Sequence, residues 1–360
     1  MLRWSMPILY LVAGARPNFM KIAPIVRALR AHGGLDYRIV HTGQHYDREM
    51  NDVFFEELGI PPPDVFMGAG GGTHAQQTAR IMVAFEELCR ATPPDAVVVV
   101  GDVDSTLACA IAAKKLRIRV AHVEAGLRSG DMTMPEEINR VVVDSIADWF
   151  FVTEPSAAAN LQREGKPEAA VHFVGNVMAD NLLYQAARLQ GARRSDRYGV
   201  VTLHRASNVD DPPTLARLAE ALCLVSRELP LVFPVHPRTR AALERSGIGF
   251  SGERITLCGP QSYMDFLALW RDAALVLTDS GGLQEETTML GVPCITLRDS
   301  TERPVTVEQG SNRLAGTQPE MIVVTALQVL RTGAGGARRP ALWDGRAAEP
   351  IVQILASALA

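Results

Sequence analysis

One polar segment in the second half of the chain combines the residue types that bind an anion. The run Asp-Ser-Gly-Gly-Leu-Gln-Glu-Glu over residues 279–286 follows the apolar residues 274–278 and opens a segment of helical character. At such a junction the unpaired backbone N–H groups and the helix dipole attract a phosphate, which can approach glycine closely. Glu286 lies about a turn further on, where its carboxylate can accept hydrogen bonds from ribose hydroxyls. The spacing favours a nucleotide diphosphate site, although two glycines before a helix also occur in tight turns that bind nothing.

Charged side chains follow the predicted strands of the first half. Arg16 and Lys21 flank the start of a helix, where two cations are either solvated or available to an anion. Asp102 follows four valines and either caps the next helix or projects from the end of the strand. Glu124 ends another apolar strand, where burial of an acid is costly unless something uses it. Glu136 lies in the first turn of a helix, an ordinary position for a carboxylate.

Two histidines end consecutive predicted strands of the second half. His204 and His236 each follow an apolar run, and a histidine in that position is either a satisfied structural residue or a group that acts on a ligand. Together with residues 279–286, they concentrate the polar groups of this half at strand ends.

Apolar runs of strand length alternate with longer segments of helical periodicity, which indicates an α/β protein with doubly wound parallel sheets. The predicted strands are 8–12, 38–41, 96–100, 120–123, 149–152, 199–203, 231–235, 255–257, 274–278 and 294–297. The first helix is predicted to start near Asn18. Ligands bind at the carboxyl ends of parallel strands, so two facing sheets are expected to hold the ligand in a cleft between them.

The length of 360 residues, 47% of them hydrophobic, allows two domains with large cores. We predict an N-terminal domain over 1–174 and a C-terminal domain over 175–346. A last helix is predicted over 347–360, with Pro350 in its first turn.

Composition argues against several classes of function. No apolar run reaches the roughly 20 residues that span a bilayer, and no secretory signal is recognisable, so we expect a cytoplasmic protein without a membrane partner. The formal net charge of −4, without a long basic run, argues against nucleic acid. The five cysteines are widely spaced and suggest reduced thiols rather than a metal site.

Five separated motifs, in the same order, resemble those of the non-hydrolysing UDP-N-acetylglucosamine 2-epimerases. They are Gly-x-Arg-Pro-x-x-x-Lys at 14–21, His-Val-Glu-Ala-Gly-Leu-Arg at 122–128, Pro-Glu-Glu-x-Asn-Arg at 135–140, the run at 279–286, and Arg-Asp-x-Thr-Glu-Arg-Pro at 298–304. The chain departs from the family at 100–106, which reads Val-Gly-Asp-Val-Asp-Ser-Thr where many members have His-Gly-Asp-Thr-Thr-Thr-Thr. It also has Asn18 where many members have Glu, and Ser207 where they commonly have Glu.

The resemblance implies a GT-B type fold, with two Rossmann-like domains facing across a cleft and the last helix packing back on the first domain. It implies an isomerase that interconverts UDP-GlcNAc and UDP-ManNAc. The reaction eliminates UDP to give 2-acetamidoglucal and adds UDP back with the opposite configuration at C2. No redox cofactor is required, and a cytoplasmic homodimer is expected.

The resemblance also implies site residues. Proton transfer is assigned collectively to Asp102, Glu124 and Glu136, and His204 is expected beside the leaving diphosphate. The expected substrate-binding residues are Arg16, Lys21, His236, Gln261, Phe266, Ser280, Gly281, Gly282, Glu286 and Arg303. Gln44 and Gln77 are candidates for a second, allosteric nucleotide-sugar site.

Other readings remain open at this point. Relatives with a similar segment around Glu136 act on UDP-diacetamido-uronic acids, and hydrolysing relatives release free N-acetylmannosamine. A GT-B glycosyltransferase would use the same UDP site, and a non-catalytic paralogue would only bind the UDP-sugar. The pathway, such as polysaccharide biosynthesis, is not encoded in these motifs.

Overall fold

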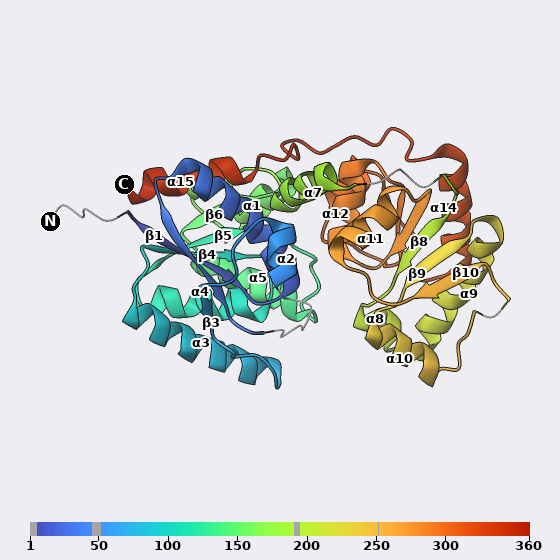
Figure 1. Ribbon diagram of the computed structural model, residues 1–360, viewed down its shortest axis with the longest axis horizontal. Coiled ribbons are helices and arrows are strands. Elements are labelled where there is room, and N and C mark those ends of the chain that lie inside the picture. The colour runs from blue at the N-terminus through green and yellow to red at the C-terminus, as the bar shows by residue number, and fades with distance from the viewer. Residues whose placement is uncertain (1–5, 45–51, 191–194, 251) are drawn as a thin grey trace. The chain divides into compact units, whose positions relative to one another are not determined.

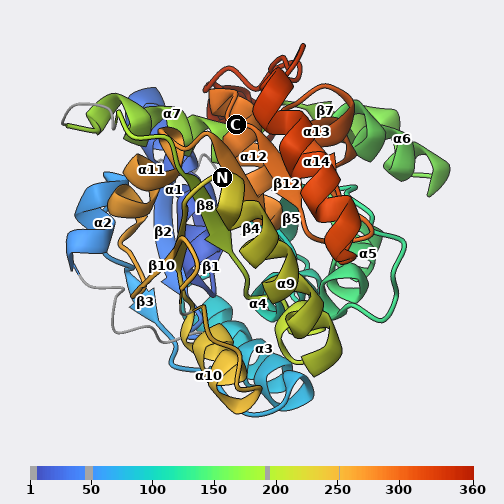
Figure 2. The same cartoon turned by 90° about the vertical axis from the view of Figure 1, so that its right-hand side faces the viewer.

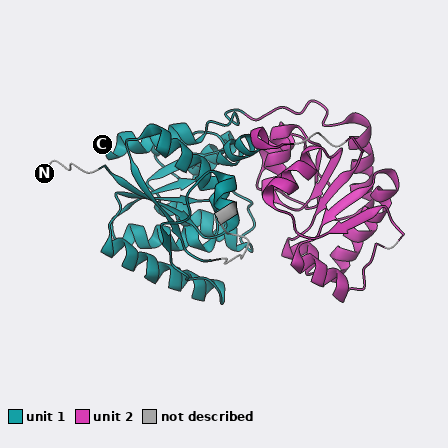
Figure 3. Cartoon of the chain, viewed as in Figure 1, with its two compact units in different colours: residues 1–185, 341–360 teal, residues 186–340 magenta. Residues whose placement is uncertain are grey.

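A computed structural model describes residues 6–44, 52–190, 195–250 and 252–360. The chain divides into two compact units (Figure 3): unit 1 contains Met1–Gln185 and Ala341–Ala360, and unit 2 contains Ala186–Pro340. Within the described ranges, no helix is both long and apolar enough to cross a lipid bilayer.

Unit 1 is built on a parallel sheet in the order β3-β2-β1-β4-β5-β6-β7. Its strands are β1 (Ile8–Ala13), β2 (Asp36–His41), β3 (Val65–Phe66), β4 (Ala96–Val100), β5 (Arg119–Val123), β6 (Trp149–Val152) and β7 (Val171–Phe173). The chain builds outward from β1 to β3 and then returns to the other side of β1 at β4. This reversal between β1 and β4 is where ligands bind in such sheets.

Helices cover both faces of this sheet (Figure 1). They are α1 (Arg16–His32), α2 (Asp52–Leu58), α3 (His74–Ala91), α4 (Asp104–Lys115), α5 (Pro135–Ile146), α6 (Pro155–Arg163), α7 (Val177–Arg188) and α15 (Ala348–Leu359). The 3-10 turn η1 (Glu168–Ala170) precedes β7. Helix α1 begins at Arg16 rather than near Asn18, because Pro17 suits the first turn, where its missing N–H needs no partner. Helix α15 packs against α1.

Unit 2 repeats the plan with the order β10-β9-β8-β11-β12-β13, again all parallel. Its strands are β8 (Gly199–Thr202), β9 (Leu231–Pro234), β10 (Ile255–Cys258), β11 (Leu275–Thr278), β12 (Cys294–Thr296) and β13 (Asn312–Leu314). Its helices are α8 (Ala206–Val209), α9 (Pro212–Glu228), α10 (Pro237–Arg245), α11 (Tyr263–Arg271), α12 (Gly281–Leu290), α13 (Pro304–Glu308) and α14 (Pro319–Thr332). Helices α9 and α14 contact each other and contribute to one apolar core with the sheet (Figure 2). The five cysteines are free thiols.

The division into units differs from the predicted boundary after residue 174, because most of α7 is held by unit 1. Gln185 Nε2 donates to the Glu57 carbonyl at 2.6 Å. The Asp180 carboxylate accepts the N–H groups of Ala347 and Ala348 at 3.0 and 2.8 Å, so it caps α15. These hydrogen bonds tie α7 and the segment before α15 to unit 1.

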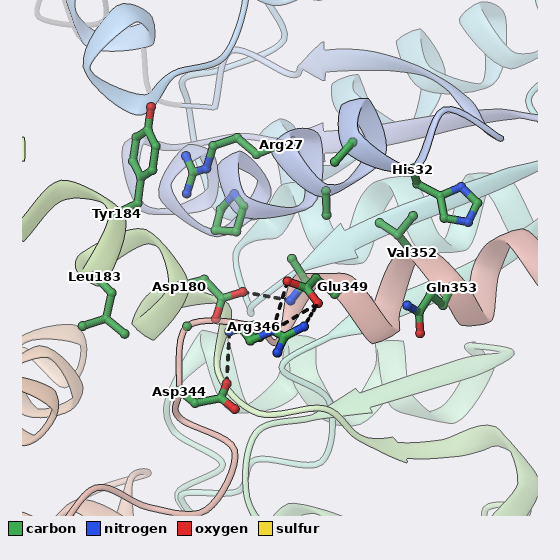
Figure 4. Close-up of a pocket in the computed structure, with 15 residues that line it drawn as sticks. Arg27, His32, Asp180, Leu183, Tyr184, Asp344, Arg346, Glu349, Val352 and Gln353 are labelled. Atoms are coloured by element: carbon green, nitrogen blue, oxygen red, sulfur yellow. Dashed lines mark hydrogen bonds and ion pairs between the residues drawn. The ribbon is translucent and has the colours of Figure 1, made fainter. Parts of the chain in front are cut away.

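A pocket of about 600 Å³ lies beside this cap (Figure 4). It is lined by residues of α1, α7 and the region around α15, among them Arg27, Asp180 and Arg346. Arg27 stacks on the Tyr184 ring at 3.9 Å, and Arg346 pairs with Glu349 at 2.8 Å. In the part of the chain that the structure describes, the residues predicted to bind substrate do not line this pocket.

Candidate active site

The turn from β1 into α1 is organised by Asn18, a departure from the family motif to which the sequence assigned no role in the site. Its Oδ1 accepts the N–H groups of Gly14 and Ala15 at 3.1 and 3.0 Å, and its Nδ2 donates to the Val100 carbonyl at 3.2 Å. Asn18 therefore ties the start of α1 to the end of β4. Arg16 lies in the same turn, with its guanidinium 5.2 Å from the centre of the Phe54 ring.

Asp102 follows β4 and does not cap α4, whose cap residue is Val103. The Asp102 carboxylate instead accepts two hydrogen bonds from Arg140 of α5, from Nε at 3.0 Å and from Nη2 at 2.6 Å. Arg140 also donates to Glu137 at 2.5 Å and is almost fully buried. This arginine was visible in the sequence motif at 135–140 but was not assigned a role.

Glu124 follows β5, and its backbone lies in the left-handed region with φ of 69°. This conformation is uncommon for residues other than glycine and is typical of functional sites. The carboxylate is 2% exposed and pairs with Lys21 Nζ at 2.5 Å. A Cβ atom at Gly101 would lie 2.7 Å from Lys21 Nζ and 3.7 Å from Glu124 Oε2, so the ends of β4 and β5 meet around this ion pair.

Helix α5 brings Glu136 to the same region of unit 1. Glu136 is half-buried in the first turn, directly before the buried Glu137. Glu137 accepts N–H groups from Ser129 and Gly130, each at 3.0 Å. Burial opposes its ionisation, but these N–H groups and Arg140 hold the pKa of Glu137 below its usual value. Glu137 therefore fixes the loop before α5, whereas the proton-transfer role of Glu136 remains a prediction.

The two predicted allosteric residues both contact the start of α4. Gln44 Oε1 accepts hydrogen bonds from the Ser105 backbone and hydroxyl at 3.0 and 2.7 Å. Gln77 Nε2 donates to Asp104 Oδ2 at 2.8 Å. Asp104 and Ser105 are departures from the family motif, and Asn139 links Asp104 to the Asp102 carbonyl. The allosteric role itself remains a prediction.

In unit 2, His204 is oriented by Asp279. His204 Nδ1 lies 2.9 Å from Asp279 Oδ1, and the His204 backbone N–H donates to the same carboxylate. Asp279 is fully buried, which opposes ionisation, but His204 and the neighbouring N–H groups hold the pKa of Asp279 below its usual value. The His236 ring lies 6.5 Å from the His204 ring, so the ends of β8 and β9 bring both predicted histidines together.

The Gly-Gly junction has the predicted form. Strand β11 ends at Thr278, Ser280 is the cap residue, and α12 begins at Gly281 and Gly282. A Cβ atom at Gly281 would lie 2.6 Å from Glu302 Oε1, whereas one at Gly282 would have nothing within 4 Å. Burial opposes ionisation of Glu302, but Arg303, Arg298 and Arg205 lower its pKa to about 2.

Glu286 lies inside α12 and accepts a hydrogen bond from Tyr263 Oη at 2.9 Å. Burial raises the pKa of Glu286 to about 7, with Glu285 adding to the effect. Gln261 and the half-buried Phe266 lie on the neighbouring segment at the start of α11, and Gln261 lines a pocket of about 380 Å³ in this unit.

Arg303 is buried at the start of α13 and forms an ion pair with Glu285, at 2.9 Å between Nε and Oε1. The pair connects α12 to the segment 298–304. Arg303 therefore holds the segment 298–304, which carries the last of the five family motifs, against α12.

Unit 1 has acids and cations at its strand ends, and unit 2 has a Gly-Gly helix start of the kind that can bind an anion. On two doubly wound parallel sheets, this arrangement is that of an enzyme of the nucleotide-sugar class with a GT-B type fold. The family model described as UDP-N-acetylglucosamine 2-epimerase matches residues 27–356. The chain belongs to the UDP-N-acetylglucosamine 2-epimerase family.

Individual relatives agree with this assignment. The chain is 41% identical to UDP-N-acetylglucosamine 2-epimerase of Methanocaldococcus jannaschii, over 96% of this chain and 98% of the relative. It is 43% identical to UDP-2,3-diacetamido-2,3-dideoxy-D-glucuronate 2-epimerase of Pseudomonas aeruginosa, over 88% and 90%. A crystal structure of the Methanocaldococcus jannaschii UDP-GlcNAc 2-epimerase in complex with UDP-GlcNAc and UDP superimposes with a TM-score of 0.89, covering 97% of this chain and 99% of that one.

Proposed function

We propose that the protein is an isomerase that interconverts UDP-GlcNAc and UDP-ManNAc. The observation that carries the proposal is the arrangement of Asp102 and Glu124 at neighbouring strand ends, each held by a buried or nearly buried cation. Family membership and 41% identity to an archaeal UDP-GlcNAc 2-epimerase support the same reaction.

The carboxylates of unit 1 serve the proton transfers. In the elimination, one carboxylate takes the C2 proton, the C2–H electrons form the double bond, and the C1–O bond breaks so that UDP leaves with its electron pair. In the addition, a carboxylic acid returns a proton to the opposite face of C2 while UDP attacks C1. Asp102, Glu124 and Glu136 share these steps, and Arg140 and Lys21 hold the first two in position.

The remaining predicted residues bind the UDP part. The start of α12 and His204 stabilise the leaving diphosphate, because N–H groups and cations favour the charge that develops on it. Arg16 and Lys21 are assigned to the same charge, and Glu286 and Ser280 to the ribose. Gln261 and Phe266 are assigned to the uracil, and His236 and Arg303 to substrate contacts in unit 2.

A second candidate is the same C2 inversion on a UDP-diacetamido-uronic acid. The 43% identity to the Pseudomonas aeruginosa enzyme favours it. That sugar carries an additional carboxylate and a second acetamido group, so the two candidates differ in the sugar and not in the chemistry.

The proposal includes two finer predictions. We expect a homodimer, to be tested by the mass measured in solution, and a cytoplasmic location, to be tested by fractionation of cells. Participation in polysaccharide biosynthesis is a further prediction, to be tested by the loss of surface polysaccharide in a strain that lacks the protein.

Proton NMR of the protein with each UDP-sugar in D2O tests the function. A UDP-ManNAc signal with deuterium at C2 supports the first candidate, and turnover of only the diacetamido-uronic acid supports the second. Free N-acetylmannosamine plus UDP would identify a hydrolysing enzyme, and UDP release only with an added acceptor would identify a transferase. Binding without turnover of either sugar would leave a non-catalytic UDP-sugar-binding protein. The Glu124→Gln variant is the control and should bind UDP without deuterium incorporation.

A further inference from the structure

A histidine and an aspartate form a fully buried pair beneath the carboxylates of unit 1. His122 of β5 and Asp144 of α5 are each 0% exposed, and His122 Nδ1 lies 2.7 Å from Asp144 Oδ1. His122 Nε2 lies 2.9 Å from the carbonyl oxygen of Gly101, the residue before Asp102. The mechanism above assigns neither residue a role.

The pair contacts the backbone on both sides of Glu124. Asp144 Oδ1 binds the side chain of His122, two residues before Glu124, while Oδ2 accepts the N–H of Gly126, two residues after it, at 2.9 Å. Glu124 between them has φ of 69°, a conformation that surrounding contacts must maintain. The Asp144 carboxylate therefore binds residues on both sides of Glu124. The His122 imidazole in turn binds the Gly101 carbonyl.

The hydrogen-bond partners determine which ring nitrogens of His122 carry hydrogen. A backbone carbonyl oxygen can only accept, so Nε2 must donate to Gly101. Asp144 Oδ2 accepts the Gly126 N–H and lies 2.8 Å from Arg128 Nη1, and both contacts favour the carboxylate form of Asp144, so Nδ1 must donate as well.

The surrounding charges are consistent with a cationic ring. Asp144 Oδ2 also pairs with Arg128 Nη1 at 2.8 Å, and Arg128 pairs with Glu164 at 2.8 Å. The positive charges of Arg128 and His122 then balance the negative charges of Asp144 and Glu164, as buried charges require. A neutral His122 would leave this group with one excess negative charge.

We propose that His122 is a buried imidazolium that acts with Asp144 as a positioning pair for catalysis, holding the strained Glu124 and the Gly101 peptide next to Asp102. The pair touches no substrate and acts only through these backbone groups. This inference rests on the proposed function for its kinetic effect, but the hydrogen count of His122 does not depend on that function.

Two substitutions remove the two hydrogen bonds of the His122 ring one at a time. In His122→Asn the amide nitrogen takes the place of Nδ1 and donates to Asp144, and the Gly101 bond is lost. In His122→Gln the amide nitrogen takes the place of Nε2 and donates to Gly101, and the Asp144 bond is lost. His172→Gln, on strand β7 of the same sheet, is the matched control.

Each His122 variant should lower kcat about 10-fold to 100-fold, with KM and UDP affinity within about 2-fold of the unmodified protein. His172→Gln should leave all three unchanged. Unchanged kcat in both His122 variants, or a loss of UDP affinity that parallels the loss of kcat, would overturn the positioning role, since general damage to the fold lowers both.

Nitrogen-15 NMR of the unmodified protein tests the protonation of His122 directly, even if both variants fail to fold. At pH 7.5 we expect one buried histidine ring with hydrogen on both nitrogens, assigned to His122 by its loss in a folded variant or by contacts from its ring hydrogens to the Gly101 residue. A ring with one bound hydrogen would overturn the proposal. Failure of the unmodified protein to turn over any UDP-sugar would instead refute the proposed function, with the ring measurement still deciding the protonation state.

Discussion

Arg140 donates two hydrogen bonds to a single oxygen of Asp102, from Nε at 3.0 Å and from Nη2 at 2.6 Å. The guanidinium presents its donors in a rigid fork, so it fixes the orientation of the carboxylate. Asp102 is thereby held by α5, and the cap residue of α4 is Val103 instead.

Arg140→Lys should therefore lower kcat about 100-fold, because lysine keeps the charge but loses the fork that orients Asp102. UDP affinity should stay unchanged. The measurement is steady-state epimerisation, with Arg90→Lys as control, since Arg90 forms an exposed pair with Glu86. Equal activity of the two variants would show that the orientation of Asp102 does not limit the reaction.

Lys21→Met should destabilise unit 1 by about 3–5 kcal/mol, because it removes the cation that pairs with the buried Glu124 carboxylate at 2.5 Å. Adding Glu124→Gln should restore much of this stability. Hydrogen exchange of the β5 amides measures the local free energy of opening in each variant. A double variant as unstable as Lys21→Met alone would show that the charge of Glu124 is not the cause.

Binding of uridine should strengthen as pH rises from 6 to 8. Burial raises the pKa of Glu286 to about 7, so the carboxylate that we propose accepts the ribose hydroxyls forms over this range. Uridine is the suitable ligand because UDP has a phosphate that titrates nearby. Calorimetry should show this pH dependence for uridine and its loss in Glu286→Gln, while 2′,3′-dideoxyuridine should bind weakly at every pH.

The Asp180 cap should make the protein less stable as pH rises. Burial raises the pKa of Asp180 to about 6, so the folded state binds the proton more tightly than the unfolded state. Its contribution is fully present below the unfolded value of about 4 and is lost as pH rises through 6, by up to about 3 kcal/mol.

Other carboxylates with lowered pKa values act in the opposite direction, so the comparison must be with Asp180→Asn. The unfolding free energy of the unmodified protein minus that of the variant should fall between pH 4 and pH 7. A difference that rises over this interval would contradict the assignment.

Gly281→Ala and Gly282→Ala should have different effects. The new methyl group at 281 would lie 2.6 Å from Glu302 Oε1 and should cost about 1–3 kcal/mol of stability, while the group at 282 meets open space. Gly282→Ala should instead preserve stability and weaken UDP binding about 10-fold, if the diphosphate lies against the start of α12. Thermal unfolding with and without UDP distinguishes the two. Undiminished UDP binding by folded Gly282→Ala would place the diphosphate elsewhere.

Local sequence patterns predicted the longer strands of both sheets, because such strands are marked by runs of apolar residues. All ten predicted strands are present, because runs such as the valines 97–100 are buried on both faces of parallel sheets. Strands β3, β7 and β13 were not predicted, since each has only two or three residues and no apolar run marks it.

The partners of the site residues could not be predicted in the same way. Arg140 and Asp102 are far apart in the sequence, as are Asp279 and His204, and only the packing of α5 and β11 brings each pair together. Glu124 and the Gly-Gly junction were identifiable because their signal is a strand end followed by an unusual residue type. Asn18 gave no such signal, because its three hydrogen bonds depend on the neighbouring strand β4.

The packing of α15 on α1 has a consequence for how the protein is made. On the ribosome, residues up to Gln185 emerge with the surface of α1 uncovered, and the helix that covers it is synthesised only after all of unit 2. Unit 2 is continuous and can fold as it emerges, whereas unit 1 must wait with an exposed apolar surface. During synthesis, the half of the protein that carries Asp102 and Glu124 is therefore the one that exposes apolar surface for longer, a condition that favours aggregation.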